Sequence, residues 1–458
     1  MEVKEVRRKL LVLIATIFGS AVVFLDGTIV NLALPKIAAN LHVGFSAQQW
    51  ISDGYLLTLS ALILLGGSLG DIFGRKKVYI LGLVGFGVTS LLCALAPNSV
   101  SLILARVVQG LFGALVVPGA LSIINTNFPQ AERGQAIGRW TAWTSAFFVL
   151  GPLLGGIILD VAIWRWIFLI NLPLIAICLI LALPSINESR DEGLRHIDYP
   201  GAILAALALA GVTYGLIQGP TQHWRAADII TLVAGAFMSG AFVWWEARSR
   251  DPMVKLSLFK SRNFSGSNLM TFAMYGALGG LTFALVIYLQ STMHYSSLKA
   301  GMSLLPVSII MFAFAARVGK LSSVYGPRIF MTVGPIVAGL GIATFYFVSP
   351  GDSYWLSVLP GALLFSCGLV LTVAPLTTTV MTSVDEHSSG IASGINNAVS
   401  RAAGLIVVAL LGLLGTHNFY HFSMALCAGL AIAAGFISYV VVVNPPRLAP
   451  KGQEHMVK

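Results

Sequence analysis

The stretch Leu25-Asp26-Gly27-Thr28-Ile29-Val30-Asn31-Leu32-Ala33-Leu34-Pro35 places a carboxylate inside the first long apolar run of the chain. A charged side chain at the centre of a bilayer costs roughly 2.5–3.5 kcal/mol on insertion scales. Charges at this depth are rare, and they usually face a bundle interior or a cavity. Asp26 is therefore the first candidate functional residue, provided that the run around it spans a membrane.

The composition of the chain identifies lipid as its solvent. Of the 458 residues, 57% are hydrophobic and only 10% are charged, whereas soluble domains contain about 25% charged residues. Windows of about 20 apolar residues indicate transmembrane helices. The chain contains fourteen such windows, at residues 10–34, 48–69, 78–96, 102–124, 136–159, 166–183, 199–217, 227–245, 267–289, 300–316, 330–348, 354–373, 391–414 and 424–443.

The distribution of Lys and Arg predicts the orientation of these spans. If the N-terminus lies inside, 22 of the 28 Lys and Arg residues fall in inner segments and four in outer ones. Inner loops carry the excess of basic residues, so we expect a multi-pass protein of the cell membrane with both termini cytoplasmic. The same asymmetry accounts for the net charge of +10 without a nucleic-acid partner. A twelve-span arrangement with residues 199–245 as a hairpin gives the same sidedness, but two runs of about 19 residues favour fourteen.

Two inner loops carry similar sequences. GSLGDIFGRK at 67–76 joins the second and third spans, and GKLSSVYGPR at 319–328 joins the tenth and eleventh. Both loops therefore join the second and third helix of a six-helix group, and many secondary transporters are built from such repeats. We predict a six-helix bundle at 1–186, a linker with two additional transmembrane helices at 187–263, a second six-helix bundle at 264–445 and a cytoplasmic tail at 446–458.

Five motifs occur in order on the expected spans. They are the first-span stretch quoted above, GSLGDIFGRKK at 67–77, RVVQG at 106–110, GPLLGG at 151–156 and WRWIFLINLP at 164–173. With these motifs the chain, over residues 10–443, resembles the major facilitator superfamily and, within it, the fourteen-helix drug:proton antiporters. The resemblance implies an all-α membrane protein of two six-helix bundles plus two central helices. It also implies a multidrug exporter that works by alternating access, and not an enzyme.

The sequence departs from this family in two places. Ile72 stands where a basic residue usually follows the loop aspartate, and the late spans contain no acidic residue. Asn396, Asn397 and Arg401 occupy a stretch where some relatives have carboxylates. These departures weaken the expectation that the protein recognises doubly charged cations broadly.

Three charged residues are predicted to lie at similar depth in the outer half of the membrane. Because a helix rises about 1.5 Å per residue, Asp26, Asp53 and Arg106 fall within roughly one helical turn of each other in depth. Burial favours the neutral form of a carboxyl group, and a nearby guanidinium favours the charged form. Our hypothesis is that Asp26 is the main proton-coupling residue and that Arg106 tunes it. The alternative is an ion pair that only fixes helix packing.

Two further charges have two interpretations each. Asp53 lies beside Trp50 and Tyr55 near the outer rim, where we expect water to reach it. It is either a solvated rim charge or a functional group that attracts cationic substrates or binds a second proton. Arg401 has no acidic partner in its own span, so it either packs and binds backbone carbonyls or reaches an anionic substrate.

Two motifs are candidate moving parts. The first is a predicted cytoplasmic gate, a latch formed in the outward-open state and broken in the inward-open one, and its residues are Asp71, Gly74, Arg75 and Lys76. The bases of this loop also serve as a topology signal. The second motif allows a span to bend and another helix backbone to approach closely. Such an approach serves either as a contact between gate helices or as plain helix packing. Its residues are Gly151, Pro152, Gly155 and Gly156.

Polar and aromatic residues within the spans are candidates for a substrate cavity, because aromatic walls with few polar groups suit lipophilic ligands. Packing against other helices or against lipid is the alternative for each of them. These candidates are Asn31, Gln109, Trp143, Phe147, Asn268, Tyr275, Asn396 and Asn397, together with Arg401.

No cofactor is expected. His417 and His421 have helical spacing but lie at an outer turn without a third ligand, so a solvated loop is favoured over a zinc site. The chain lacks a glycine-rich nucleotide-binding loop that ends in lysine, and the proton gradient is the expected energy source.

The sequence favours a proton-coupled antiporter that exports small lipophilic, often cationic compounds. Its partners would be the substrate, protons and the lipid bilayer, and we expect a monomer. The alternative is a proton-coupled transporter of one specific metabolite or amphipathic anion, which Arg401 and the acid-free late spans would fit. A membrane-embedded enzyme would need a nucleophile or metal cluster, and a channel would need a pore-lining ring, and the sequence indicates neither.

Overall fold

The computed structural model describes residues 2–190, 197–385, 389–414 and 418–444. The predicted cytoplasmic tail at 446–458 and His417 lie outside these residues. The N-terminal half contains α1 (Glu2–Leu41), α2 (Phe45–Phe73), α3 (Arg75–Leu95), α4 (Ser99–Asn127), α5 (Gln130–Val161), α6 (Trp166–Leu169) and α7 (Asn171–Ser185). The inserted region contains α8 (Tyr199–Thr221), α9 (Ala226–Glu246) and the 3-10 turn η1 (Leu256–Lys260).

The C-terminal half repeats this arrangement of helices. It contains α10 (Arg262–Ser291), α11 (Ser297–Ser303), α12 (Leu305–Tyr325), α13 (Pro327–Phe345), the π-helical turn η2 (Tyr354–Val358), α14 (Leu359–Thr382), α15 (Ser389–Leu411), the 3-10 turn η4 (Gly412–Leu414) and α16 (Phe419–Val441). Two expected spans are interrupted. The span at 166–183 consists of α6 and α7, and the span that begins near residue 300 consists of α11 and α12.

Thirteen helical segments of the described residues are long and apolar enough to cross a membrane. The fourteenth expected span corresponds to α5, which has 32 residues and an apolar portion at Leu150–Val161. The predicted all-α membrane architecture is therefore confirmed. α8 and α9 have 23 and 21 residues, each about the length that crosses a bilayer, which favours fourteen spans over twelve.

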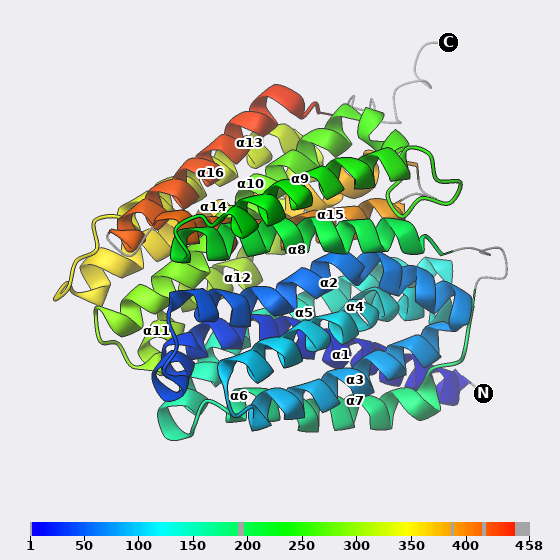
Figure 1. The fold of residues 1–458 in the computed structure, drawn as a ribbon. Coiled ribbons are helices and arrows are strands. Elements are labelled where there is room, and N and C mark those ends of the chain that lie inside the picture. Colours follow the sequence, from blue (N-terminus) through cyan, green and yellow to red (C-terminus); the bar gives the residue numbers. More distant parts are fainter. Residues whose placement is uncertain (1, 191–196, 386–388, 415–417, 445–458) are drawn as a thin grey trace, which may run out of the picture.

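α1 begins and α16 ends at the same end of the molecule (Figure 1). We call this the basal end, and we call the opposite end, where α1 is followed by α2, the distal end. An even number of crossings places both ends of the helical region on one side, as the sequence predicted.

Both halves join their second and third helices through a glycine in the left-handed region. Gly74 has a φ of 112° and Gly326 a φ of 89°, values that residues with a Cβ rarely adopt. A Cβ on Gly74 would lie 2.8 Å from the Glu188 carboxylate carbon, and one on Gly326 would lie 2.5 Å from the Asn444 side chain.

These two neighbours cap the third helix of each half. Glu188 accepts hydrogen bonds from the amides of Lys76 (3.0 Å) and Lys77 (3.2 Å), and Asn444 accepts one from the amide of Arg328 (3.0 Å). The first amides of a helix have no partner within the helix, so they need such acceptors. The repeat between residues 67–76 and 319–328 therefore extends from sequence to matching tertiary contacts.

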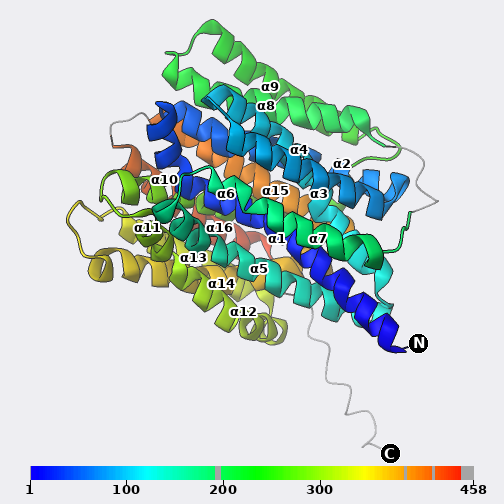
Figure 2. The ribbon, with the colours of Figure 1, turned by 90° about the horizontal axis from the view of Figure 1, so that it is seen from below.

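The inserted helices bridge the two halves on one side. α8 packs against both α2 and α15, and Leu216 and Ile217 of α8 form a buried cluster with Ala409 of α15. The Trp50 ring of α2 lies 6.1 Å from the Tyr214 ring of α8. Figure 2 shows α8 and α9 along one edge of the molecule, with α12, α13 and α14 along the opposite edge.

Candidate functional site

Asp26 and Arg106 form an ion pair inside the N-terminal half. The Asp26 side chain is fully buried and Arg106 is 1% exposed, and Arg106 Nη1 donates to Asp26 Oδ2. Removing one partner of a buried pair leaves an uncompensated charge, which is strongly destabilising. The sequence placed these residues at one depth, and the structure brings them into direct contact.

Three polar side chains surround this ion pair and complete its hydrogen bonds. Asn171 Nδ2 donates to Asp26 Oδ1 at 2.9 Å, and Gln109 Nε2 donates to the same oxygen at 3.3 Å. Gln109 Oε1 accepts from Arg106 Nη1 at 2.6 Å. Ser90 Oγ accepts from both amides, at 2.8 Å from Gln109 and 3.1 Å from Asn171. We call Asp26, Ser90, Arg106, Gln109 and Asn171 the carboxylate network.

The network joins α1, α3, α4 and α7 of one half, and sequence reasoning found only part of it. Gln109 lies three residues after Arg106, a spacing that places both on one helix face, but it was predicted to line the substrate cavity. In this conformation Gln109 is fully buried against Asp26, and its place in a substrate cavity stays a prediction. Asn171 lies in the 164–173 motif, where it begins α7. No sequence signal identified Ser90.

Arg106 also contacts α2. Its Nε donates to the carbonyl of Ile51 at 3.2 Å, and its guanidinium carbon lies 4.2 Å from the centroid of the Tyr55 ring. The Tyr55 hydroxyl donates to the carbonyl of Val23 at 3.0 Å. Tyr55 therefore connects the guanidinium of α4 back to the α1 backbone, one turn from Asp26.

Asp53 is not the water-exposed rim charge that the sequence suggested. Its side chain is fully buried, and within the described part of the chain neither carboxylate oxygen has a hydrogen-bond partner. It also lies outside the carboxylate network, so the three charges do not converge. The error has a physical cause, because depth along a helix does not reveal what packs on its face: α2 is covered by both α8 and α15 near this level.

Arg401 of α15 reaches toward α1 across the boundary between the halves. Its guanidinium carbon lies 5.2 Å from the centroid of the Phe24 ring, and its Nε has no hydrogen-bond partner. Among the residues that the structure describes, no backbone carbonyl accepts a hydrogen bond from it. The expected carbonyl pairing is thus replaced by a cation–π contact.

A second polar group lies within the C-terminal half. Asn396 Nδ2 of α15 donates to Thr271 Oγ1 at 2.8 Å and to Asn268 Oδ1 at 3.2 Å, both on α10. Asn397 instead donates to the carbonyl of Ser393 in its own helix at 3.1 Å. Asn268 and Asn396, both predicted for the cavity, are thus together, whereas Asn397 bonds within α15. Tyr275, one turn further along α10, is half-buried.

The other predicted cavity residues lie at separate places. Asn31 accepts a hydrogen bond from Ser52 Oγ at 3.0 Å. Phe147 packs against Phe18, with their ring centroids 5.6 Å apart, and Trp143 is 59% exposed. None of these contacts involves the Asn268–Asn396 pair.

The predicted cytoplasmic gate lies at the basal end. Asp71 at the end of α2 pairs with Arg75 at the start of α3, with Asp71 Oδ1 2.7 Å from Arg75 Nε. Lys76 Nζ donates to the carbonyl of Leu183 at 2.7 Å. These contacts stay within the N-terminal half. A latch to the other half therefore stays a prediction.

The glycine motif of α5 forms close contacts at the distal end. A Cβ on Gly151 would lie 2.2 Å from Thr28 Oγ1, and one on Gly155 would lie 3.0 Å from Ile29, both on α1. A Cβ on Gly156 would lie 2.6 Å from the Cα of Leu298 on α11. The predicted close approach of another backbone is confirmed, because Gly156 joins α5 to the C-terminal half.

Other contacts also close the distal end between the halves. The Phe45 ring of α2 lies 5.7 Å from the Phe283 ring and 4.7 Å from the Phe419 ring. Gln49 Nε2 donates to the carbonyl of Val408 at 2.7 Å. In this conformation, the two halves are therefore joined where α1 ends and α2 begins.

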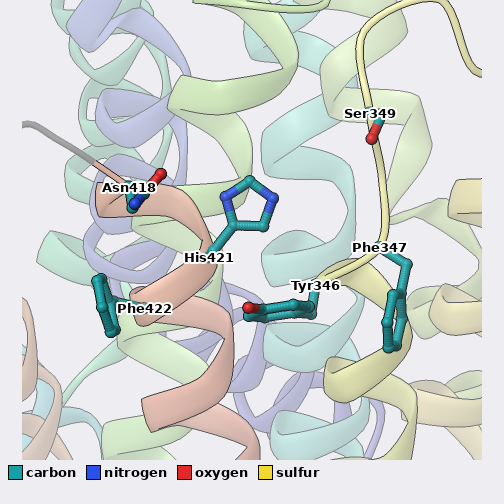
Figure 3. A pocket seen from close by; sticks show the side chains of 6 residues that line it. All are labelled: Tyr346, Phe347, Ser349, Asn418, His421 and Phe422. Carbon is teal, nitrogen blue, oxygen red and sulfur yellow. The ribbon is translucent and has the colours of Figure 1, made fainter.

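A separate pocket opens at the distal surface of the C-terminal half, with a volume of about 410 Å³. Figure 3 shows His421 above the Tyr346 ring, with Phe347 and Ser349 on one side and Asn418 and Phe422 on the other. Phe347 is 77% exposed and Phe422 is 54% exposed. Aromatic residues at this level are typical of a membrane interface, so this pocket is not a counterpart of the buried network.

Comparisons with known proteins agree with this architecture. The family model for the Major Facilitator Superfamily matches residues 16–409. The multidrug resistance protein Stp of Mycobacterium tuberculosis (strain CDC 1551 / Oshkosh) is 35% identical over 408 residues, which cover 89% of this chain and 76% of that protein. The methylenomycin A resistance protein of Bacillus subtilis (strain 168) is 33% identical over 429 residues, which cover 92% and 90%.

Solved structures show the same fold at low sequence identity. A POT family transporter in complex with 5-aminolevulinic acid aligns with a TM-score of 0.71 and 15% identity, over 93% of this chain and 94% of that one. At this identity the likeness concerns the fold alone.

Proposed function

The chain belongs to the major facilitator superfamily, and from that premise we propose that it is a proton-coupled exporter of small lipophilic compounds, many of them cationic. It is a multi-pass membrane transporter of small molecules and not an enzyme. The relatives that match most of the chain are named for resistance to antibiotics and other drugs. A transporter in the membrane lowers a drug's internal concentration by exporting it, which supports the direction that we propose.

The observation that carries proton coupling is the buried Asp26 carboxylate with its guanidinium partner. A carboxyl group in such a place exchanges a proton only if its partner can move away, since the pair favours the charged form. We assign the present arrangement, with Asp26 bound to Arg106 and the distal end closed, to the state after proton release. Once the distal end has opened, a proton that enters from that side would neutralise Asp26, release Arg106 and favour return to the distally closed conformation.

The contacts between the network and the other half suggest how substrate could influence the proton site. Arg106 lies on the Tyr55 ring, Tyr55 binds the α1 carbonyl of Val23, and the neighbouring Phe24 lies under Arg401. A substrate that separates Arg401 from Phe24 would therefore disturb the segment of α1 that carries Asp26.

We further infer that the basal end faces the cytoplasm, as the distribution of basic residues indicates. Exchange of one proton for a monovalent cation moves no net charge, so the pH gradient alone would drive it. Export of a neutral compound would also draw on the membrane potential, at about 2.3 kcal/mol per charge per 100 mV. The present closure of the distal end corresponds to a state that takes up substrate from the cytoplasmic side.

A second candidate function is proton-coupled transport of one specific metabolite or amphipathic anion. One observation favours it: Arg401 is a half-buried cation whose Nε has no hydrogen-bond partner among the residues that the structure describes. The Asn268–Thr271–Asn396 group, which includes a residue of the same helix α15, is neutral. Such a site could accept an anionic group without a competing carboxylate.

The test reconstitutes the protein in liposomes that contain a pH-sensitive dye and challenges them with cationic dyes, neutral drugs and amphipathic acids. We expect several cationic or neutral compounds to cause proton movement, and Asp26→Asn to abolish it. Because this variant leaves the buried Arg106 without its partner charge, its melting temperature is measured to show that the protein used in the assay is folded. Asp251→Asn is the matched control, because Asp251 is an exposed loop carboxylate. Full transport by Asp26→Asn would refute the coupling role, and a response to one acid only would favour the second candidate.

A further inference from the structure

A carboxylate from one half caps a helix of the other half at the distal end. Asp160, in the last turn of α5, accepts hydrogen bonds from the amides of Ser297 (3.0 Å) and Leu298 (3.2 Å) at the start of α11. The next amide, that of Lys299, donates to Ser296 Oγ at 3.2 Å. The first three amides of α11 are thus all satisfied, and two of them depend on Asp160 across the boundary.

The backbones approach closely enough for this contact because both sides carry glycine. A Cβ on Gly156 would lie 2.6 Å from the Cα of Leu298, and one on Gly301 would lie 2.4 Å from the carbonyl oxygen of Pro152. One turn after Gly156, the Asp160 side chain therefore lies beside the free amides of α11. A neutral contact accompanies it, since Gln290 Nε2 of α10 donates to the carbonyl of Leu32 at 2.8 Å.

The charges around Asp160 favour its ionised form. Lys36 Nζ of α1 lies 3.6 Å from Asp160 Oδ1 and also donates to the carbonyl of Leu159. Lys299 of α11 lies over the Tyr295 ring, and Arg165 beside α6 donates to the carbonyl of Ala96. Among the described residues of these elements, only Lys36 forms an ion pair with Asp160.

Unlike Asp26, Asp160 is open to the surrounding medium. Its side chain is 26% exposed, so protons can reach it without any opening of the bundle. Hydrogen bonds that a carboxylate accepts are roughly twice as strong as those between neutral groups. Protonation would weaken both amide contacts and remove the attraction of Lys36.

We propose that Asp160 is a proton-responsive latch that holds the distal ends of the two halves together when ionised and releases them when protonated. The direction of the pH dependence follows from these contacts. The closed state is stabilised only by ionised Asp160, so a lower pH shifts the equilibrium toward the open state. This proposal rests on the proposed function in one respect: the distal end is taken to face the outside of the cell. An acidic exterior would then open the exporter on the side from which protons enter.

The experiment measures separation of the halves and not transport, so a failure of the latch is distinguishable from a failure of the proposed function. Spin labels on Pro97→Cys and Pro350→Cys, both exposed in distal loops of opposite halves, report the distance across the distal end. Cys367 is replaced by serine because it is the exposed native cysteine. Double electron–electron resonance is recorded in lipid nanodiscs between pH 5 and pH 8, without substrate.

We expect the open population to rise as pH falls. In Asp160→Asn, we expect the open-to-closed ratio at pH 8 to be about tenfold higher than in the wild type, which corresponds to the loss of one or two charge-assisted hydrogen bonds. This variant should show only a weak change of that ratio with pH. Lys36→Gln should keep the response but move its midpoint to higher pH, because the carboxylate loses its cationic neighbour.

The Asp26→Asn background separates the latch from the carboxylate network. The proposal requires that Asp26→Asn retain a pH-dependent opening and that the double variant with Asp160→Asn lose it. If Asp26→Asn removes the whole pH response, or if Asp160→Asn opens and closes with pH as the wild type does, the latch is overturned. Melting temperatures of all variants show that each is folded.

Discussion

At the scale of single residues, Asp26 differs from Asp53 in what surrounds it. Asp26 has a cation and two amide donors from α4 and α7, whereas the buried Asp53 carboxylate has no hydrogen-bond partner among the residues described. An ionised carboxylate is stable in the first environment and costly in the second. The Asp26 carboxylate therefore has groups that compensate its charge in the present conformation, and the Asp53 carboxylate does not.

Asn171 is a positioning residue for this site, and its removal should move the pH dependence of transport. Its amide donates to Asp26 Oδ1 at 2.9 Å, a bond that stabilises the charged form. In Asn171→Leu, we expect the pH at which transport is half-maximal to rise by about one unit, which corresponds to the loss of one hydrogen bond to a charged group. Proton flux in liposomes across a pH series measures it.

Ser90→Ala is the matched control for that variant. Ser90 accepts hydrogen bonds from Asn171 and Gln109 and forms no hydrogen bond with Asp26 among the described residues. The pH of half-maximal transport should therefore move less in Ser90→Ala than in Asn171→Leu. An unchanged midpoint in Asn171→Leu, with folded protein, would argue that Asn171 serves packing alone.

At the scale of elements, the contact between α5 and its neighbours depends on glycine. The motif at 151–156 brings α5 against α1 and against α11, which belongs to the other half. Small residues allow helix backbones in a membrane to approach closely. This helix therefore combines a fixed contact within its own half with a contact that must break when the distal end opens.

Gly156→Val should prevent distal closure. Its Cβ would lie 2.6 Å from the Cα of Leu298, and because the neighbour is backbone, the helices must separate. We expect transport to fall by at least about tenfold, on the order of the 1–3 kcal/mol that overpacking costs, together with an increased distal distance between spin labels at 97 and 350.

Gly138→Ala controls for helix propensity in the same element. A Cβ on Gly138 would meet nothing within 4 Å, so this variant should transport normally, and alanine should favour the helix by about 1 kcal/mol. Equal losses in both variants would show that any change in α5 is harmful and that the Leu298 contact has no special role.

At the scale of the whole molecule, two similar halves are joined by a bridge that contacts both. The halves repeat their positive-φ glycines and the caps at Glu188 and Asn444. α8 packs against α2 and α15 on one side of the boundary, and the α5–α11 contact closes the distal end. During a rocking motion of the halves, α8 must therefore stay packed against α2 and α15 or slide along them, while the contacts at the distal end break.

Reporter fusions check the orientation on which the direction of transport depends. With the basal end in the cytoplasm, green fluorescent protein fused after Lys458 should fluoresce, and alkaline phosphatase inserted after Pro350 should be active. Phosphatase inserted after Ser249, in the basal connection after α9, should be inactive and serves as the control. The reverse pattern would place the distal end inside and would reverse the direction proposed for the latch.

The sequence by itself determined the features that depend on local composition. The apolar windows marked the spans, the bases predicted one side for both ends, and the Gly-Pro-Gly-Gly motif marked a close backbone contact. It also placed Asp26 and Arg106 at one depth. Each of these conclusions follows from hydropathy, charge or steric size along a single helix.

Only the tertiary structure decided which side chains meet. It placed Gln109 against Asp26, covered Asp53, added Ser90 and Asn171 to the network, set Arg401 over Phe24 and joined Asp160 to α11. The physical reason is that each of these contacts joins different helices. Lipid stabilises any apolar helix surface to almost the same extent. Hydropathy therefore does not determine how a span is rotated about its axis or which helices it contacts. Packing and hydrogen bonds between helices determine both.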